Sequence, residues 1–446
     1  MSEMYAVTST ELGELPADWP VQRFDSLFAV QQGKQVSKTN RIGENQRPFL
    51  RTKNVFWGKL DLSDLDEMHF TDAEEKRLTL HPGDLLVCEG GDIGRTAIWN
   101  DALPRCYYQN HLHRARLRDK GCADSQFALY WLWYGFEIGS VYFGRGNVTT
   151  IPNLSQSKLC ELPLPVPPLS EQRKIAGVLG VVQRAMEQQA RLLALTAELK
   201  KTLLHKLFTE GLRGEPQKPT EIGPVPESWE VVPLGSLATK ISKGSSPRWQ
   251  GFEYVSEGVL FVRSQNVGAG RMDFSDRVFL SPKFNEQEKR SILKNEDILI
   301  NLVGASIGRV ALGTPEIEGA NCNQAVGFVR MDCRRSFKDF LVAFLLSPAG
   351  QQQMFFQKKD IARANLSLLD LKTFKVPVPP TAEVEEIAEV FLQIEAKLAI
   401  HQHKHATLTA LFRTLLHQLM TAQIRVHDLD LKGLLAQAGA ERDSKS

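Results

Sequence analysis

The sequence predicts an α+β fold with two globular domains in tandem repeat, each followed by a long helix, and with the two helices paired as an antiparallel coiled coil. Three observations predict it: an internal repeat, a proline-rich segment at the end of each globular part, and a heptad pattern of apolar residues after each such segment. With 446 residues, the chain is also too long for one hydrophobic core, since single cores stop growing near about 250 residues.

The repeat begins with a short motif near the N-terminus. Gly-x-Leu-Pro-x-x-Trp at 13–19 returns as Gly-x-Val-Pro-x-x-Trp at 223–229, and Arg-x-x-Asn-Val at 51–55 returns at 263–267. Further matches follow in the same order along both copies. Both copies are therefore expected to share one fold, while their many differing residues are expected of two related domains with different ligands.

Proline-rich segments mark the end of each globular part, because proline lacks the N–H that the interior of a strand or helix needs. Pro165-Val-Pro-Pro168 corresponds to Pro377-Val-Pro-Pro380, and from there the offset stays constant through both helices. The predicted organisation, in order, is a globular domain over 1–168, a helix over 169–211, a linker over 212–225, a second globular domain over 226–380, a second helix over 381–424 and a tail over 425–446.

Apolar residues spaced alternately by four and three define a seam along each helix, as in a coiled coil. The predicted seam consists of Ile175, Leu179, Val182, Met186, Leu193, Leu203 and Leu207 in the first helix and of Ile387, Phe391, Ile394, Leu398, Leu408, Phe412, Leu415 and Leu419 in the second. Polar residues interrupt the stripe near the middle, where they favour one register or partner at some cost in stability. They are Gln189, Thr196 and Lys200 in the first helix and His401 and His405 in the second.

Charge predicts how the helices are oriented. The first helix ends in basic residues that include Lys200 and Lys201, whereas the second begins with acidic residues that include Glu383 and Glu386. Antiparallel pairing brings these charges together and agrees with the helix dipoles. Cysteines placed near Lys201 and Glu386 are then expected to form a disulfide; the alternative is that both charged sets only face solvent.

Composition excludes several classes of protein. The net charge is only +2, so charge alone does not make the chain a general nucleic-acid binder, and positive charge must be localised if DNA is the partner. Its six cysteines contain no C-x-x-C pair, which favours scattered reduced thiols over a zinc site. No apolar run reaches about 18 residues and no secretory leader is visible, so no membrane contact and a cytoplasmic location are expected.

Motifs for catalysis are also missing. The chain has no G-x-x-x-x-G-K-[ST] loop, H-E-x-x-H pair or [DN]-P-P-[YF] segment. Gly304-Ala-Ser306-Ile-Gly308 reads as the G-x-S-x-G turn of hydrolases, but Asp92 stands at the serine position in the first copy, so a shared tight turn explains both. His401 and His405 lie one helical turn apart, yet both fall on the seam, and no metal site is expected.

Taken together, these features resemble the specificity subunit of type I restriction-modification enzymes. The most family-like stretches are Pro163-Leu-Pro-Val-Pro-Pro-Leu-Ser-Glu-Gln-Arg-Lys-Ile-Ala176, Leu207-Phe-Thr-Glu-Gly-Leu212 and Ile222-Gly-Pro-Val-Pro-Glu-Ser-Trp229. The second helix departs from the pattern, because it begins with Thr381-Ala-Glu-Val-Glu-Glu-Ile-Ala388 in place of the Ser-Glu-Gln-Arg-Lys form.

The resemblance implies that each globular part is a target recognition domain for one half of an asymmetric, bipartite site in double-stranded DNA. It also implies that the paired helices set the spacing and dock two methyltransferase subunits, and that restriction subunits join through the complex. No catalytic residue and no cofactor is then expected in this chain. The methyltransferases would bring S-adenosylmethionine, and the restriction subunits would bring ATP and Mg²⁺.

Candidate DNA contacts are chosen by side-chain chemistry, because the resemblance gives no guide to the loops. They are Lys34, Gln35, Lys38, Arg41, Arg51, Lys53 and Asn54 in the first copy and Lys243, Ser245, Ser246, Arg248, Trp249, Gln250, Arg263, Gln265 and Asn266 in the second. Residues shared by both copies cannot explain different specificities, which makes Lys53, Gln265, Arg248 and Gln250 the better candidates for base readout. The alternatives are solvated loops and, for the shared Arg and Asn, structural hydrogen bonds.

Two other functions fit the same architecture. One is a coiled-coil scaffold that joins two protein partners without touching DNA, and the other is a DNA-recognition subunit of a different defence complex. Salt-dependent binding to one DNA sequence distinguishes the first alternative, and co-purification with a methyltransferase distinguishes the second. A hydrolase remains a third alternative, which depends on Ser306 alone.

Overall fold

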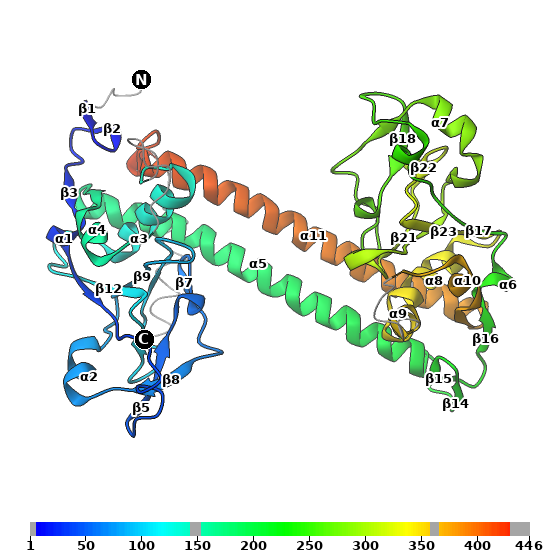
Figure 1. Cartoon of the computed structure of the whole chain (residues 1–446), viewed down its shortest axis with the longest axis horizontal. Coiled ribbons are helices and arrows are strands. Elements are labelled where there is room, and N and C mark those ends of the chain that lie inside the picture. Colours follow the sequence, from blue (N-terminus) through cyan, green and yellow to red (C-terminus); the bar gives the residue numbers. More distant parts are fainter. Residues whose placement is uncertain (1–5, 143–152, 357–364, 429–446) are drawn as a thin grey trace. The chain divides into compact units, whose positions relative to one another are not determined.

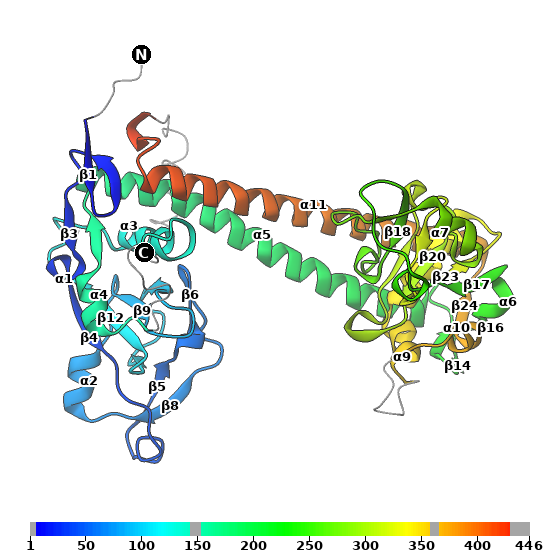
Figure 2. The same cartoon turned by 45° about the horizontal axis from the view of Figure 1, so that its top comes forward.

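A computed structural model describes residues 6–142, 153–356 and 365–428 of the chain (Figure 1). The chain divides into two compact units: unit 1 comprises residues 1–188 and 405–446, and unit 2 comprises residues 189–404. Two long helices, α5 (Leu169–Glu210) and α11 (Thr381–Met420), contribute to both units. The two helices lie side by side in both views (Figures 1 and 2) and contact each other within each unit.

The globular part of unit 1 contains two small sheets. A four-stranded antiparallel sheet has the order β10 (Thr96–Ile98), β9 (Leu85–Cys88), β12 (Leu112–Leu117), β4 (Phe28–Gln32). A three-stranded sheet has the order β11 (Tyr107–Tyr108), β5 (Gln46–Leu50), β8 (Asp66–His69), in which β11 and β5 run parallel. The remaining elements are β1 (Val7–Thr10), β2 (Gly13–Pro16), β3 (Val21–Arg23), α1 (Phe24–Leu27), β6 (Val55–Phe56), β7 (Lys59–Leu60), α2 (Asp72–Leu78), α3 (Ser125–Trp133), α4 (Gln156–Glu161) and β13 (Pro163–Pro165).

Unit 2 repeats this topology, as the sequence predicts. Its four-stranded sheet has the order β21 (Val310–Leu312), β20 (Ile298–Asn301), β23 (Val326–Arg330), β17 (Lys240–Lys243), and its three-stranded sheet has the order β22 (Asn321–Cys322), β18 (Val259–Val262), β19 (Phe279–Leu280). Its other elements are β14 (Gln217–Thr220), β15 (Gly223–Pro226), β16 (Glu230–Pro233), α6 (Leu234–Leu237), α7 (Pro282–Gln287), α8 (Arg335–Leu346), α9 (Pro348–Phe356), α10 (Leu368–Thr373) and β24 (Lys375–Val378). Two copies of one α+β domain are therefore present in tandem.

Each proline-rich segment begins within the last residues of a short strand. Strand β13 pairs with β3, and β24 pairs with β16, each as a two-stranded antiparallel pair. A proline is tolerated there because a two-stranded pair leaves one edge of each strand without a ladder partner. The long helices start directly afterwards: Glu171 and Glu383 donate their backbone N–H groups to the carbonyls of Pro168 and Pro380 at 2.8 and 2.9 Å.

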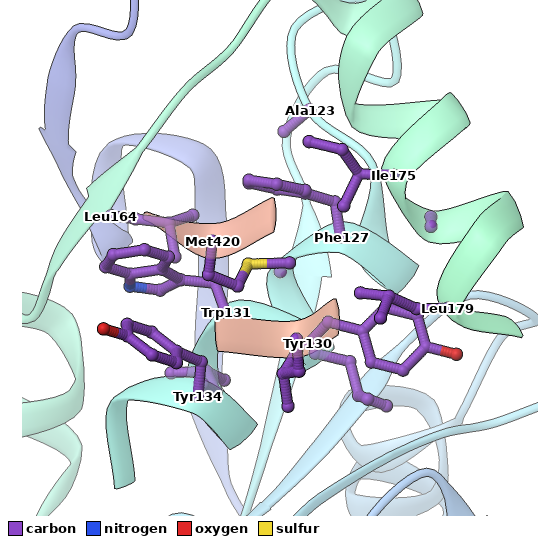
Figure 3. Packing of buried hydrophobic residues seen from close by; sticks show 14 of the residues in the cluster. Ala123, Phe127, Tyr130, Trp131, Tyr134, Leu164, Ile175, Leu179 and Met420 are labelled. Atoms are coloured by element: carbon purple, nitrogen blue, oxygen red, sulfur yellow. The ribbon is translucent and has the colours of Figure 1, made fainter. Parts of the chain in front are cut away.

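The core of unit 1 joins the globular part to both long helices. Helix α3 is buried on almost all sides, and Phe127, Tyr130 and Trp131 pack between α5 and the C-terminal end of α11 (Figure 3). The helices contribute Ile175, Leu179 and Val182 from α5 and Phe412, Leu416, Leu419 and Met420 from α11. The C-terminal end of α11 is thus part of the hydrophobic core of the first globular domain.

Unit 2 has the equivalent core. Phe208 near the end of α5 makes edge-to-face contacts with Trp229, Phe340 and Phe344 at centroid distances of 6.5, 5.2 and 5.3 Å. Residues from the start of α11, including Ile387 and Phe391, complete the cluster. Among the residues that the structure describes, no helix is both long and apolar enough to cross a membrane.

Candidate nucleic-acid interface

Two equivalent loops carry many of the predicted DNA contacts. Loop 1 (residues 33–45) connects β4 to β5, and loop 2 (residues 244–258) connects β17 to β18. Each starts at a glycine whose N–H bonds a carbonyl of the neighbouring strand at 3.1 Å, Gly33 to Leu112 and Gly244 to Val326. A Cβ atom would lie 2.2 Å from a backbone oxygen at Gly33 and 1.8 Å from one at Gly244, so both positions require glycine.

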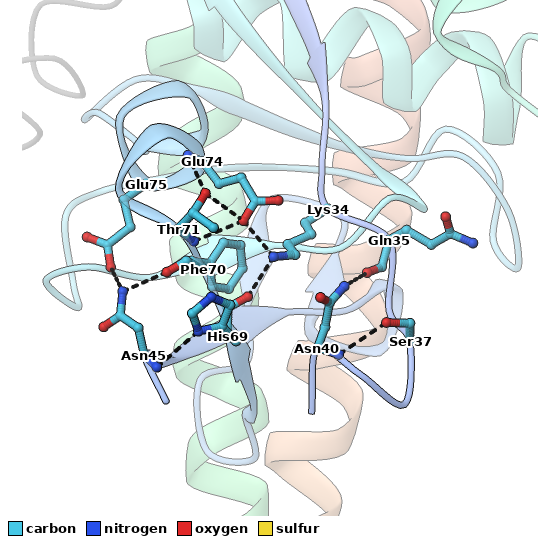
Figure 4. A network of polar contacts seen from close by, with 10 residues as sticks. All are labelled: Lys34, Gln35, Ser37, Asn40, Asn45, His69, Phe70, Thr71, Glu74 and Glu75. Carbon is cyan, nitrogen blue, oxygen red and sulfur yellow. Dashed lines mark hydrogen bonds and ion pairs between the residues drawn. The ribbon is translucent and has the colours of Figure 1, made fainter. Parts of the chain in front are cut away.

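Loop 1 is held by a buried lysine. Lys34 is only 8% exposed, and its ammonium group donates to a carboxylate oxygen of Glu74 at 2.6 Å and to the carbonyl of His69 at 2.8 Å (Figure 4). Burial opposes the charge of Glu74, but the hydrogen bonds from Lys34 and Thr71 keep the pKa of this carboxyl below its ordinary value. The charge of Lys34 is therefore balanced inside the domain, and the residue positions the loop.

Loop 2 is held by a buried glutamate at the corresponding place. The Ser245 hydroxyl and the Gln250 amide each donate to the Glu288 carboxylate at 2.7 Å, and Arg290 pairs with it at 3.2 Å. Burial again opposes the charge, yet these hydrogen bonds hold the pKa of Glu288 below its usual value. Ser245 and Gln250 thus fix the loop from within.

Other predicted residues of the loops lie at the surface. Gln35, Lys38, Lys243, Arg248 and Trp249 are exposed, and Ser246 is half-buried. Arg41 is also exposed, and its guanidinium donates to the Asp66 carboxylate at 3.1 Å. These side chains are accessible to a ligand, whereas Lys34 and Ser245 are not.

The Arg-x-x-Asn motif builds the same turn in both copies. The Asn54 side chain accepts the backbone N–H of Arg51 at 2.9 Å and donates to the carbonyls of Asp61 at 3.0 Å and Asp64 at 2.9 Å. In the second copy Asn266 makes the same three bonds, to Arg263, Asp273 and Asp276. Both asparagines are buried, which favours the structural alternative for the shared Asn.

The shared arginines of this motif are also held by ion pairs within the domain. Arg51 pairs with Asp66 at 2.6 Å and Arg263 with Asp276 at 2.9 Å, and both side chains are largely buried. Between Arg and Asn, the copies differ at an exposed position, where Lys53 corresponds to Gln265. Each of these two side chains contacts a carboxylate of its own turn. The exposed, unshared residues of the motif remain the candidates for reading bases.

A second glycine turn connects each globular part to the long helices. Gly58 and Gly270 both have positive φ, 69° and 103°. A Cβ atom would lie 2.4 Å from the Gln183 amide at Gly58 and 2.7 Å from the Glu395 carboxylate at Gly270. The two helix residues occupy equivalent places in α5 and α11. This repeated close approach, which the sequence motifs do not reveal, holds each turn against a helix within its own unit.

The apparent hydrolase motif forms a turn. Gly304 and Gly308 have φ angles of 76° and 86°, values that favour glycine, and the Ser306 hydroxyl bonds only weakly, at 3.5 Å, to the Val303 carbonyl. Within the described part of the chain, no cluster of three or more His, Cys, Asp or Glu side chains is arranged to hold a metal ion.

The long helices contact each other through polar and apolar groups. In unit 2, the Gln189 amide oxygen lies 3.0 Å from a ring nitrogen of His401, and Lys200 forms an ion pair with Glu395. All predicted seam residues are buried or half-buried, whereas Leu195, Leu199, Leu392, Ile400 and Leu411, which lie off the seam, are exposed. Leu204, Phe208, Leu416 and Met420 are buried as well, although the heptad prediction leaves them out.

Comparison with known proteins gives consistent matches. The family described as "Type I restriction modification DNA specificity domain" matches residues 16–196 and 226–410. The putative type I restriction enzyme MjaX specificity subunit of Methanocaldococcus jannaschii is 25% identical over 429 residues, covering 94% of this chain and 96% of its own. The type I restriction enzyme EcoBI specificity subunit of Escherichia coli is 27% identical over 416 residues, covering 87% and 83%.

A solved structure shows the same fold. The type I restriction-modification system S subunit from M. genitalium superposes with a TM-score of 0.56 at 20% sequence identity. The match covers 90% of this chain and 96% of the other.

Proposed function

This chain belongs to the type I restriction-modification DNA specificity family, and on that premise we propose that each recognition domain reads one half of an asymmetric, bipartite site in double-stranded DNA. The proposal rests on loops 1 and 2, each of which is held in place by hydrogen bonds inside its own domain. Loops 1 and 2 start from equivalent glycines and are each held by a carboxylate, that of the half-buried Glu74 or of the buried Glu288, yet they expose different side chains. Two different half-sites require two domains that share a backbone scaffold but expose different side chains.

The two helices, we propose, pair as an antiparallel coiled coil that sets the spacing of the half-sites. Within unit 2 the contacts support this orientation: Gln189 meets His401, Lys200 meets Glu395, and the N–H of Leu212 donates to Glu383 at 2.6 Å. As the residue number rises from Gln189 to Leu212, the residue contacted in α11 moves back from His401 to Glu383, as expected of antiparallel helices. Helices of 42 and 40 residues are each roughly 60 Å long at about 1.5 Å per residue, more than the roughly 34 Å of one DNA turn.

A thiol cross-link tests the orientation and the register. Cysteines at Lys200 and Glu395 are expected to be joined readily by a short bis-maleimide, because the ion pair between these two long side chains shows that the positions face each other. Cysteines at Lys201 and Glu386, which charge alone suggested, are expected to react poorly, since Glu386 pairs with Arg213. Electrophoresis measures both. Cross-linking of the second pair but not of the first would contradict the proposed register.

The family also guides the proposed partners. Two methyltransferase subunits would dock on this chain, and restriction subunits would join through them. S-adenosylmethionine would be held by the methyltransferases, and ATP with Mg²⁺ by the restriction subunits, while this chain would act without a catalytic residue of its own in the cytoplasm.

Loop 2 supplies a direct test of DNA binding. Arg248 is exposed in this loop, and replacing it by alanine is expected to weaken DNA binding at least tenfold, because an arginine contact to a base or phosphate is lost. Affinity at physiological salt measures the effect. The Lys372→Ala variant removes an exposed cation of α10 outside the loop and is expected to bind like the wild type. Unchanged affinity of Arg248→Ala would remove loop 2 from the interface.

The function itself is tested by mapping adenine methylation across a genome. Cells that express this chain with its methyltransferase are expected to gain one asymmetric, split motif that is missing without the chain. Exchanging residues 226–380 for the matching segment of a relative should change one half of the motif and leave the other. A stable complex with the methyltransferase but no new motif would favour the protein scaffold instead.

A further inference from the structure

We propose that Ile42 and Trp249 are apolar recognition side chains, each of which packs against the bases of the half-site bound by its own domain; this inference rests on the proposed DNA-binding function. Of the large hydrophobic side chains in the described part of the chain, these two are the most exposed, at 83% and 86%. Each follows an arginine, Arg41 or Arg248, in one of the two equivalent loops. Each loop thus presents an arginine followed by an exposed apolar side chain, although Ile42 lies nine residues after Gly33 and Trp249 five residues after Gly244.

The backbone around Ile42 is fixed on both sides. The N–H of His69 donates to the carbonyl of Asn40 at 2.7 Å, and the Asn40 side-chain amide donates to the Gln35 carbonyl at 2.9 Å (Figure 4). On the other side, a Cβ atom at Gly43 would lie only 2.4 Å from His69, so the chain passes directly over this ring. Ile42 therefore projects from an ordered loop.

The backbone around Trp249 is fixed by different residues. Trp249 is the middle residue of a 3₁₀ turn over Arg248–Gln250, and the N–H of Phe252 closes the turn on the Pro247 carbonyl at 3.0 Å. Gln250 is held by the Glu288 carboxylate, and the Phe252 ring packs edge-to-face on Phe284 at 5.3 Å. The loop is already ordered in the free protein, so little conformational entropy is lost when the exposed indole binds a ligand.

Cations that precede both side chains favour DNA as the ligand. Lys38 and Arg41 lie before the isoleucine, and Lys243 and Arg248 lie before the tryptophan. Loop 1 also exposes Glu44, and loop 2 exposes Glu253 and Glu257, so the attraction comes from these local cations and not from the net charge of the loops. Cations attract the phosphate backbone, while an apolar side chain can pack on a thymine methyl group or insert at a base step. An aromatic side chain that inserts at such a step can stack on the face of a base. An indole in one copy and a branched aliphatic group in the other would also favour different bases.

Tryptophan fluorescence can detect the contact directly. All seven tryptophans lie in the described residues, and the other six are buried or half-buried, so acrylamide should quench Trp249 most strongly. The probe is duplex DNA carrying the motif found by methylation mapping, added to the full chain in complex with its methyltransferase. Subtracting the signal of the Trp249→Phe complex isolates Trp249. We expect its quenching constant to fall at least twofold when this DNA binds.

Affinity measurements complete the test. Trp249→Ala is expected to weaken binding to the motif at least tenfold and Trp249→Phe by less than about threefold, because the phenyl ring can still stack. Ile42→Ala should weaken binding through the other half-site. The matched control is Leu369→Ala, which removes a side chain that is 68% exposed on α10 and should leave the affinity unchanged.

The possible outcomes distinguish a failure of this inference from a failure of the proposed DNA-binding function. If the wild-type complex shows no sequence-specific binding, the proposed function fails. If it binds the motif while Trp249 stays equally quenchable and Trp249→Ala binds normally, only the present inference fails. Shielding of Trp249 by the methyltransferase before DNA is added would overturn it in favour of a protein contact.

Discussion

Replacing Arg425 by alanine is expected to lower the free energy of unfolding of unit 1 by about 3–5 kcal/mol, because the change leaves a buried carboxylate without its main counter-charge. The Arg425 side chain is 4% exposed, and its guanidinium donates two hydrogen bonds of 2.8 Å to Glu171, which is 6% exposed. It also pairs with Asp18 at 2.7 Å, and the Trp19 indole donates to Glu171 at 3.2 Å. Arg425, five residues beyond the end of α11, thus connects this helix to the start of α5 and to the first domain.

The internal repeat provides the control. Arg213 stands at the equivalent place in the second copy, but its ion pair with Glu386 lies at the surface, where the side chains are 49% and 50% exposed. Arg213→Ala should therefore lower the free energy of unfolding far less than Arg425→Ala does, because solvent screens an exposed ion pair. Hydrogen exchange of unit 1 and unit 2 amides measures each variant locally. Equal losses from both would show that burial does not determine the importance of this arginine.

The same contact predicts an acid dependence. The hydrogen bond from Arg425 holds the pKa of the Asp18 carboxyl below its ordinary value. Because the folded-state pKa is depressed, the contribution of Asp18 to stability is present above its unfolded pKa and is lost as the pH falls through the folded value. This part of the acid sensitivity should disappear in the Arg425→Ala variant.

Phe412→Ala is expected to destabilise unit 1 by about 3–5 kcal/mol, although the residue belongs to the second long helix. Phe412 is 2% exposed, and its ring centroid lies 4.8 Å from that of Trp133 and 6.0 Å from that of Tyr130. Truncation leaves a cavity against α3 that the rigid aromatic neighbours cannot fill. The amides of α3 should therefore exchange faster, as hydrogen exchange can measure.

The neighbouring residue is the matched control for this prediction. Leu411 is 44% exposed and lies off the predicted seam, so Leu411→Ala should change stability by no more than about 0.5 kcal/mol. If Phe412→Ala instead loosened α8 of unit 2 and left α3 unchanged, the assignment of this helical segment to the first core would be wrong.

Much of the architecture follows from sequence pattern, because it depends on local spacing. The repeated Gly-x-x-Pro and Arg-x-x-Asn motifs predict two copies of one domain, and the two copies have the same strand order. The predicted seam residues are buried or half-buried, since heptad spacing places them on one face of each helix. From the sequence alone, Asn54 and Asn266 could be either DNA contacts or structural groups. The sequence could not decide between these roles, because the asparagines donate to backbone carbonyls up to ten residues away.

By itself, then, the sequence determined the tandem domains, the long helices and the family. Only the tertiary structure decided which groups face solvent and which helix segment joins which core. Lys34 is a candidate DNA contact from the sequence, but Glu74, 40 residues away, balances its charge inside the domain. The apolar side chain of Ile42, in contrast, is exposed. Phe412 follows the second domain but packs in the first. Burial and charge balance depend on partners that the folded chain brings together, whereas periodicity describes one element at a time.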